Sequence, residues 1–102
     1  MATLKKITSP TKEIEEIIKQ RIRGSKEIKT KWEESDHSAI VLVHGNPAEL
    51  LFAADLAQKT ANVTIFELTG TCQFHFSMIA LVGDISSVNM AAESINLSLG
   101  KK

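Results

Sequence analysis

The charged side chains of this chain are concentrated in its first third, and that distribution limits what the rest can form. Residues 1–36 hold 16 of the 24 charged residues, whereas residues 38–99 hold only six. So little charge over so long a stretch would leave a monomer with an apolar surface. Such surfaces more often mark contacts between subunits than free surface. The sequence therefore favours an oligomer; the alternative is that this part is simply the buried core.

Length and composition describe one globular domain, which we assign to residues 1–102. A chain of 102 residues with 43% hydrophobic and 24% charged residues has room for a thin core and is not disordered in composition. Its net charge of zero argues against nucleic-acid and anionic-membrane partners, which need a surplus of basic residues. No apolar run reaches the roughly 20 residues of a membrane span or resembles a secretory signal, so we expect a reduced, cytosolic protein.

The N-terminal third is predicted to contain a short edge strand, a helix and a charged connector. The strand is expected over residues 3–8. Ser9 and Pro10 are typical of a helix N-cap and first helical position, and Gly24 stands where the helix should end. Residues 26–34 alternate in polarity and predict either a short strand or a connector. The apolar face of the helix is formed by Ile14, Ile17, Ile18 and Ile22.

The remaining residues predict three strands and two helices. The strands are expected over residues 38–44, 62–68 and 73–82. Asn46 and Glu49 have the spacing of a capping box, which begins a helix that runs to about Thr60. Gly83 and Asp84 begin a last helix. This order predicts an α/β (α+β) sandwich of ferredoxin-like type, with a mainly antiparallel sheet flanked by helices.

Three motifs follow one another between Ser38 and Ile95. The first is an alanine-rich helix with a terminal lysine and a following Ala-Asn-Val, over residues 53–63. The second is a loop that contains Gly70, and the third is Val82-Gly83-Asp84 followed by Val88 and Ala91-Ala92. In order and spacing these motifs resemble the bacterial microcompartment (BMC) shell domain.

The ends of the chain differ from ordinary BMC shell domains, in which a further strand and helix follow the last matched helix. Here the matched part stops near Leu99, and the missing strand and helix correspond to residues 3–23. This arrangement is similar to circularly permuted shell proteins, because neighbouring exposed termini can be moved without changing the packed fold. The resemblance implies one permuted domain, with residues 1–36 as the permuted strand, helix and connector and residues 37–99 as the core.

The resemblance also implies a structural role without catalysis. BMC shell domains form cyclic homohexamers that tile with other shell proteins around enclosed enzymes. Lys59, together with Asp55 and Asn62, would then lie at the hexamer edge, where neighbouring hexamers meet. From the residues alone, Lys59 is better explained as an exposed lysine that the helix dipole favours near a helix C-terminus.

Cys72 is the one cysteine of the chain, which excludes an intrachain disulfide and a Cys-paired metal site within one subunit. A lone cysteine in an apolar sequence is usually a small core residue. Cys72, however, lies in a Gly-containing loop between two predicted strands, and the resemblance puts that loop on the six-fold axis. Six copies would form a ring of thiols, which are soft ligands suited to iron–sulfur clusters, zinc or copper(I).

The loop residues Gly70, Thr71, Cys72 and Gln73 resemble the pore motif of shell proteins from glycyl-radical propanediol microcompartments. Those proteins carry a proline between the cysteine and the glutamine, and this chain does not. The resemblance implies an iron–sulfur cluster, of the [4Fe–4S] type, that Cys72 binds and that subunits share at the pore. Whether such a pore passes metabolites, electrons or clusters is left open by the residues.

Two other functions are compatible with the residues. One is a small oligomeric ligand-binding regulatory module with a ferredoxin-like fold. The other is a thiol enzyme that uses Cys72, which is disfavoured because no base partner can be identified. We therefore expect no enzymatic activity. His37 and His44 lack acidic or cysteine neighbours at ligand spacing and are interpreted as structural.

Overall fold

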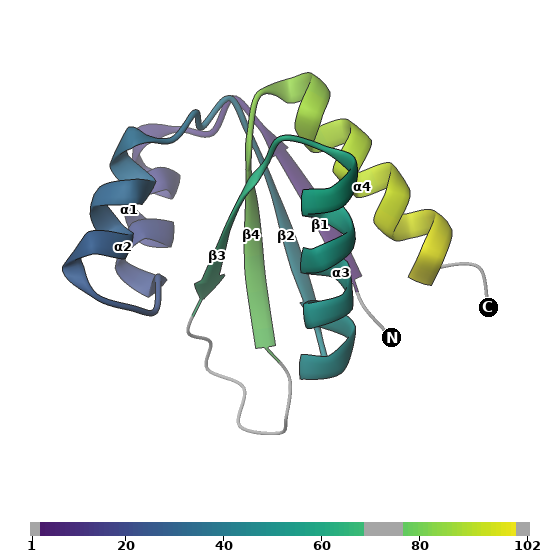
Figure 1. The fold of residues 1–102 in the computed structure, drawn as a ribbon. Coiled ribbons are helices and arrows are strands. Elements are labelled where there is room, and N and C mark those ends of the chain that lie inside the picture. The colour runs from purple at the N-terminus through teal and green to yellow at the C-terminus, as the bar shows by residue number, and fades with distance from the viewer. Residues whose placement is uncertain (1–2, 69–76, 100–102) are drawn as a thin grey trace.

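The computed structural model describes residues 3–68 and 77–99, which form one four-stranded sheet with helices on both faces (Figure 1). In chain order the elements are β1 (Thr3–Thr8), α1 (Lys12–Arg21), α2 (Lys26–Glu34), β2 (Ala39–Gly45), α3 (Pro47–Thr60), β3 (Thr64–Leu68), β4 (Ser77–Gly83) and α4 (Ile85–Leu99). The predicted strand over residues 73–82 is confirmed from Ser77 onward, and residues 73–76 lie outside the described part. None of the helices in the described part is long and apolar enough to span a membrane.

The sheet is antiparallel throughout, with the strand order β1-β2-β4-β3. Read from β2, the chain passes through strand, helix, strand, strand and helix, and the edge position of a final strand is filled by β1. This is the split β-α-β arrangement of the ferredoxin-like fold with its last strand moved to the front of the chain. β1 begins on the side of the molecule where α4 ends (Figure 1). The topology confirms the predicted ferredoxin-like sandwich and its permuted order.

The two faces of the sheet carry separate apolar clusters, because successive residues of a strand point to opposite sides. On β2, Val41 and Val43 pack with α3 and α4, whereas Ile40 packs with α1 and α2. The second cluster is built on Phe66 and Trp32, whose rings meet edge to face at a centroid distance of 5.3 Å. The sheet is therefore the middle of three layers.

The predicted starts of α3 and α4 are confirmed. Asn46 Oδ1 accepts from the Glu49 backbone N–H at 2.9 Å, and Glu49 Oε1 accepts from the Asn46 N–H at 3.4 Å, which completes the capping box. At α4, Asp84 Oδ1 accepts from the Ser87 N–H at 2.8 Å. A Cβ on Gly83 would lie 3.3 Å from the Asn62 carbonyl oxygen, so the residue before this cap has little room for a side chain.

The predicted boundaries of the first helix are wrong at both ends. The N-cap is Thr11, whose hydroxyl accepts from the Ile14 N–H at 3.3 Å. Ser9 has a φ of 50° and donates its N–H to the Ser38 carbonyl at 2.9 Å, which holds it beside β2. At the other end the helix stops before Ile22, because the chain there bridges to the edge of β3, and Gly24 lies in the connection to α2.

Residues 26–34 form a helix, so the prediction of a strand or connector is also wrong. Lysine and glutamate fill most positions of α2 and have good helix propensity. Ile28 and Trp32 fit the alternation of a strand, but they are also four residues apart and share one helix face. Trp32 packs against the sheet with 2% of its surface exposed. Burial of this one large side chain fixes which side of α2 faces inward.

Candidate functional site

The four residues expected at the pore, Gly70, Thr71, Cys72 and Gln73, lie outside the described residues. The strands that flank them are described. Leu68 at the end of β3 pairs with Met78, and Ser77 at the start of β4 pairs with Gly45 at the end of β2. The segment that carries Cys72 therefore joins two neighbouring strand ends at one end of the sheet.

Two of the three residues expected at a hexamer edge are brought together on α3. Lys59 Nζ lies 2.9 Å from Asp55 Oδ2, and the two side chains are 72% and 65% exposed. The hydrogen bond to Asp55 raises the pKa of Lys59 above its ordinary value. Asn62 is exposed in the connection that follows α3, and no hydrogen bond of its side chain joins this pair among those described. Asp55 holds the Lys59 ammonium on an open surface.

The strand ends on either side of residues 69–76 and the expected edge residue Lys59 lie toward opposite ends of α3. α3 begins at Pro47, directly after the end of β2 that pairs with Ser77, and it ends at Thr60. Its 14 residues span about 21 Å at 1.5 Å per residue. Figure 1 shows α3 running from the end of the sheet where β3 stops and β4 starts toward the opposite end. The helix thus separates Lys59 from the strand ends that carry residues 69–76.

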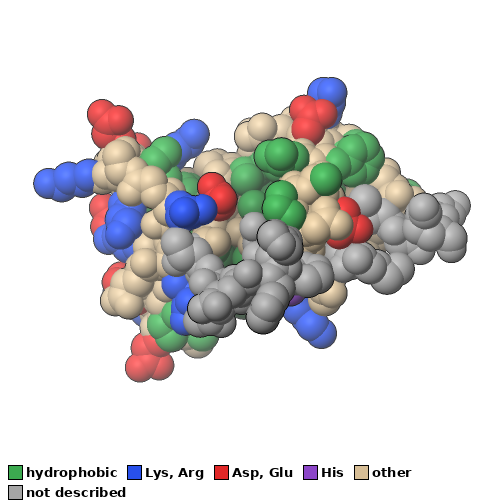
Figure 2. Space-filling view, turned by 90° about the horizontal axis from the view of Figure 1, so that it is seen from below, with side chains coloured by type: hydrophobic (Ala, Val, Ile, Leu, Met, Phe, Trp, Pro, Cys, Tyr) green, Lys and Arg blue, Asp and Glu red, His purple; other side chains and the backbone are tan. Residues whose placement is uncertain are grey.

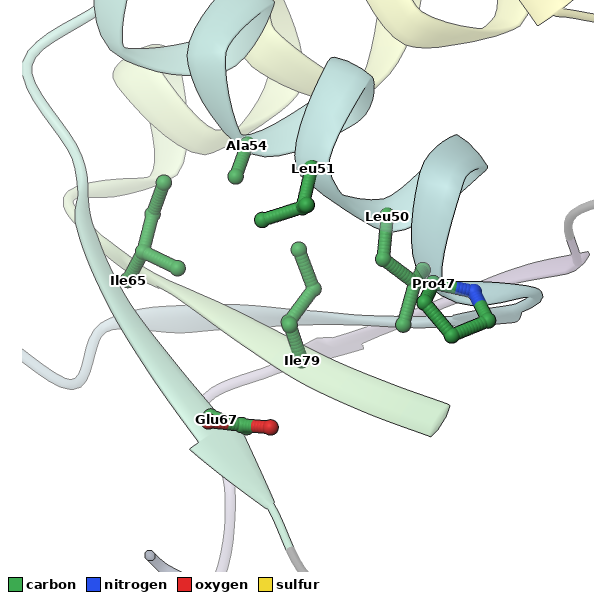
Figure 3. A pocket seen from close by; sticks show the side chains of 7 residues that line it. All are labelled: Pro47, Leu50, Leu51, Ala54, Ile65, Glu67 and Ile79. Atoms are coloured by element: carbon green, nitrogen blue, oxygen red, sulfur yellow. The ribbon is translucent and has the colours of Figure 1, made fainter. Parts of the chain in front are cut away.

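An apolar groove lies between the first half of α3 and the edge of the sheet (Figure 3). It has a volume of about 290 Å³, and Glu67 is the one ionisable residue among those that line it. Leu51, which lines it, is 73% exposed, and Phe52, the next residue of α3, is 50% exposed. The lining residues come from α3, β3 and β4: Pro47, Leu50, Leu51, Ala54, Ile65, Glu67 and Ile79.

The groove is suited to apolar contact rather than to chemistry. The Glu67 carboxylate lies 3.6 Å from the Arg23 guanidinium, so it is occupied by an ion pair with the segment that follows α1. Figure 2 shows charged side chains mostly over the α1–α2 side of the molecule and exposed hydrophobic side chains nearer α3. In the described part of the chain, no three His, Cys, Asp or Glu side chains gather to hold a metal ion.

The contacts of His37 were not predicted from the sequence. Its ring lies between Glu15 of α1 and the end of α2, with both nitrogens within hydrogen-bond distance of an oxygen. Glu15 is 22 positions away in the chain, so no local spacing could signal this pair. His44, by contrast, is an exposed residue of β2 that pairs with Thr3 and Met78, in agreement with a structural role.

The chain is similar to one known family and to several solved structures. The BMC domain matches residues 39–101. The GrpU microcompartment shell protein from Pectobacterium wasabiae is 30% identical, with a TM-score of 0.70 over 92% of this chain and 99% of its own. The GrpU shell protein from Clostridiales bacterium 1_7_47FAA is 26% identical, with a TM-score of 0.66 over 92% and 87%. Both structures are ligand-free.

A third similarity concerns the order of the elements. The fused permuted hexameric shell protein from the RMM microcompartment has a TM-score of 0.70 at 17% identity, over 98% of this chain and 46% of its own. At that identity it is similar in fold alone, and the shared fold is a permuted one. Among curated proteins, none matches the chain. With most of its sheet, α3 and α4 inside the matched residues 39–101, the chain belongs to the BMC domain family.

Proposed function

We propose that this protein is a structural subunit of a bacterial microcompartment shell, which assembles as a cyclic homohexamer, joins other shell proteins and has no catalytic activity. The observation that carries the proposal is the BMC match over residues 39–101 within a permuted ferredoxin-like fold. Two GrpU shell proteins resemble the chain over nearly its whole length. The two ends of α3 fit the same role, because a pore at one end and a contact edge at the other allow hexamers to tile.

In this hexamer the groove beside α3 faces a neighbouring subunit. It adjoins the strand ends that carry the pore residues, and in a ring the surfaces next to the axis meet the adjacent copies. A cyclic ring joins two different surfaces of the same chain at each contact. The exposed Leu51 and Phe52 would be covered there, which accounts for an apolar surface on a chain with little charge in this half.

The pore carries an iron–sulfur cluster in our proposal, as in the glycyl-radical propanediol type of shell. Support comes from the resemblance of residues 70–73 and from the donor chemistry. One subunit contributes one thiol, and among its described residues no three His, Cys, Asp or Glu side chains gather to hold a metal ion. Zinc sites and cubic clusters each need about four ligands. A six-fold ring presents six equivalent thiols, which do not match a cluster that takes four ligands. Cys72 from alternate subunits, together with one ligand from outside the protein, would supply the four.

Native mass spectrometry of protein purified without oxygen tests the assembly and the cluster together. We expect six chains plus the mass of one cluster for the wild type, and six chains without iron for Cys72→Ser. A hexamer without added mass, or iron retained in Cys72→Ser, would contradict the cluster and leave the shell proposal intact. A monomer or dimer would contradict the shell proposal itself.

The edge role of Lys59 has its own test by electron microscopy of assembled protein. Lys59→Gln should remain hexameric in the mass spectrum but lose extended sheets, because the exposed ammonium held by Asp55 is removed. Lys12→Gln, on the exposed surface of α1, is the matched control and should form sheets like the wild type. Normal sheets from Lys59→Gln would show that hexamers meet through other residues.

A further inference from the structure

The α1–α2 pair is joined to the rest of the subunit by few contacts. Ile18 and Trp32 are the only buried residues within the two helices. A backbone bond from the Arg23 N–H to the Glu67 carbonyl, 2.8 Å long, ties the connection between them to β3. An ion pair between Lys19 and Glu33 joins α1 to α2. The polar contacts that fix α1 to the start of β2 converge on one side chain, His37.

The His37 ring is held on three sides. Nδ1 lies 2.9 Å from Glu15 Oε1, and Nε2 lies 2.5 Å from the carbonyl oxygen of Trp32. The ring stacks on the Trp32 indole, with a centroid distance of 4.0 Å and an interplanar angle of 27°. The His37 side chain is 14% exposed and that of Glu15 29%. One imidazole therefore contacts α1, α2 and the segment that leads into β2.

Only one protonation state of the ring can donate to both of these oxygens. A backbone carbonyl and a carboxylate both accept hydrogen bonds and neither donates. Neutral imidazole has one N–H and can serve only one of them, whereas imidazolium has two and serves both. An indole face is also a favourable neighbour for a cation. The contacts of His37 are all satisfied by the protonated ring.

The charges around His37 agree with this state. Glu15 on α1 faces Nδ1, and the carboxylate of Asp36, next along the chain, also attracts the ring. On α2, Trp32 presents its carbonyl and its indole, which are uncharged. If the proton left to solvent while Nε2–H kept the Trp32 carbonyl, the lone pair on Nδ1 would face the Glu15 carboxylate. The contact with α1 would then become repulsive.

We propose that His37 is a proton-dependent latch that holds α1 and α2 over one face of the sheet. The protonated ring closes the latch by donating to Glu15 and Trp32, and loss of its proton loosens α1. Histidine ordinarily changes charge between pH 5 and 8, so this layer tightens toward the acidic end of that range and loosens toward the basic end. The latch gives one face of the subunit a cover that responds to pH.

Trp32 reports the state of the latch, because it is the one tryptophan and the chain has no tyrosine. The experiment follows its emission and its quenching by acrylamide, a neutral probe, in the full-length protein from pH 5 to 8.5. Far-UV circular dichroism is recorded in the same samples. We expect the Trp32 emission to change with pH along a titration curve for one proton. Quenching by acrylamide should rise several-fold toward high pH while the circular dichroism stays constant.

Three variants decide whether His37 is responsible. His37→Gln should lose the emission change, and His44→Gln, a histidine on β2, should keep it. Glu15→Gln should show a smaller rise in quenching than the wild type, because α1 then lacks the carboxylate that the ring contacts at either pH. A transition retained in His37→Gln, or unaltered in Glu15→Gln, would overturn the proposal. So would an emission change without increased quenching, because the ring would then titrate while α1 stayed closed.

Discussion

The two helical layers of this subunit are attached to the same sheet in different ways. α3 and α4 bury Leu50, Ala53, Ala57, Val88, Ala91 and Ile95, whereas α1 and α2 bury only Ile18 and Trp32. Charged residues are distributed the other way: α1 and α2 carry twelve of them, whereas α3 and α4 carry four. Both layers bury apolar side chains against the sheet, but α1 and α2 bury fewer of them and carry more charge.

The difference separates the roles of the two layers. Apolar burial changes little with pH or salt, so the α3–α4 layer is a fixed scaffold for the strand ends and for Lys59. Hydrogen bonds and ion pairs at a half-exposed surface contribute less and depend on protonation and screening. The α1–α2 layer is therefore the one that can loosen while the sheet remains folded.

The strongest test of this comparison truncates one isoleucine in each layer. Ile95→Ala removes a fully buried side chain of α4, and we expect the free energy of unfolding to fall by about 4 kcal/mol, within the range for buried Ile→Ala changes. Ile18→Ala removes a side chain of α1 that is 6% exposed, and we expect about 2 kcal/mol. Urea titrations followed by circular dichroism, at one protein concentration, measure both.

The comparison depends on which of the two variants loses more free energy of unfolding. Equal losses would mean that α1–α2 is as firmly built into the core as α3–α4. In Ile18→Ala we further expect Trp32 emission to change at a lower urea concentration than the circular dichroism. Coincident transitions would contradict the separate opening of the α1–α2 layer.

A smaller difference is expected between the two helix caps. Asn46→Ala removes the 2.9 Å bond to the Glu49 N–H and half of a capping box, and should cost about 1 kcal/mol. Thr11→Ala removes a single 3.3 Å bond at an exposed helix start and should cost about 0.5 kcal/mol. The same urea titrations measure the pair. A Thr11 cap worth more than the Asn46 cap would reverse the comparison.

The scaffold layer was largely predictable from sequence, because its signals are local. Asn46 and Glu49 stand at capping-box spacing, and the apolar strands and alanine-rich helix follow simple periodicities. The start of α1 was not predictable in the same way. Ser9 precedes Pro10 and fits an N-cap in sequence, but its φ of 50° is not the extended backbone of an N-cap. The Ser9 N–H donates to the carbonyl of Ser38, 29 residues later in the chain.

The α1–α2 layer shows where local patterns fail. Ile28 and Trp32 fit a strand and a helix equally well, and burial of Trp32 against Phe66 decides between them. The partners of His37 are invisible in sequence, since Glu15 reaches it only when α1 folds over the sheet. Of the candidate site, the pairing of Asp55 with Lys59 follows from their spacing of four residues on a helix. The role of Cys72 depends on copies that one chain does not contain.

The smallest expected effect is a loss of stability at acid pH that involves Asp36, in the connection between α2 and β2. Hydrogen bonds from the Ser38 hydroxyl at 2.5 Å and from the Ser38 N–H at 2.9 Å hold the pKa of Asp36 below its ordinary value of 3.8. A lowered pKa in the folded state means that the folded protein binds this proton less tightly than the unfolded chain. Its stabilising contribution is therefore complete above the ordinary value and is lost as pH falls through the folded value.

Wild-type protein should accordingly lose more stability between pH 5 and pH 3 than Asp36→Asn, in which nothing titrates at this position. Ser38→Ala removes the stronger of the two donors and keeps the backbone one, so its loss should lie between the two. Urea titrations at both pH values measure these differences, which are small because Asp36 is on the surface. An Asp36→Asn variant with the full acid dependence of the wild type would assign that dependence to other carboxylates.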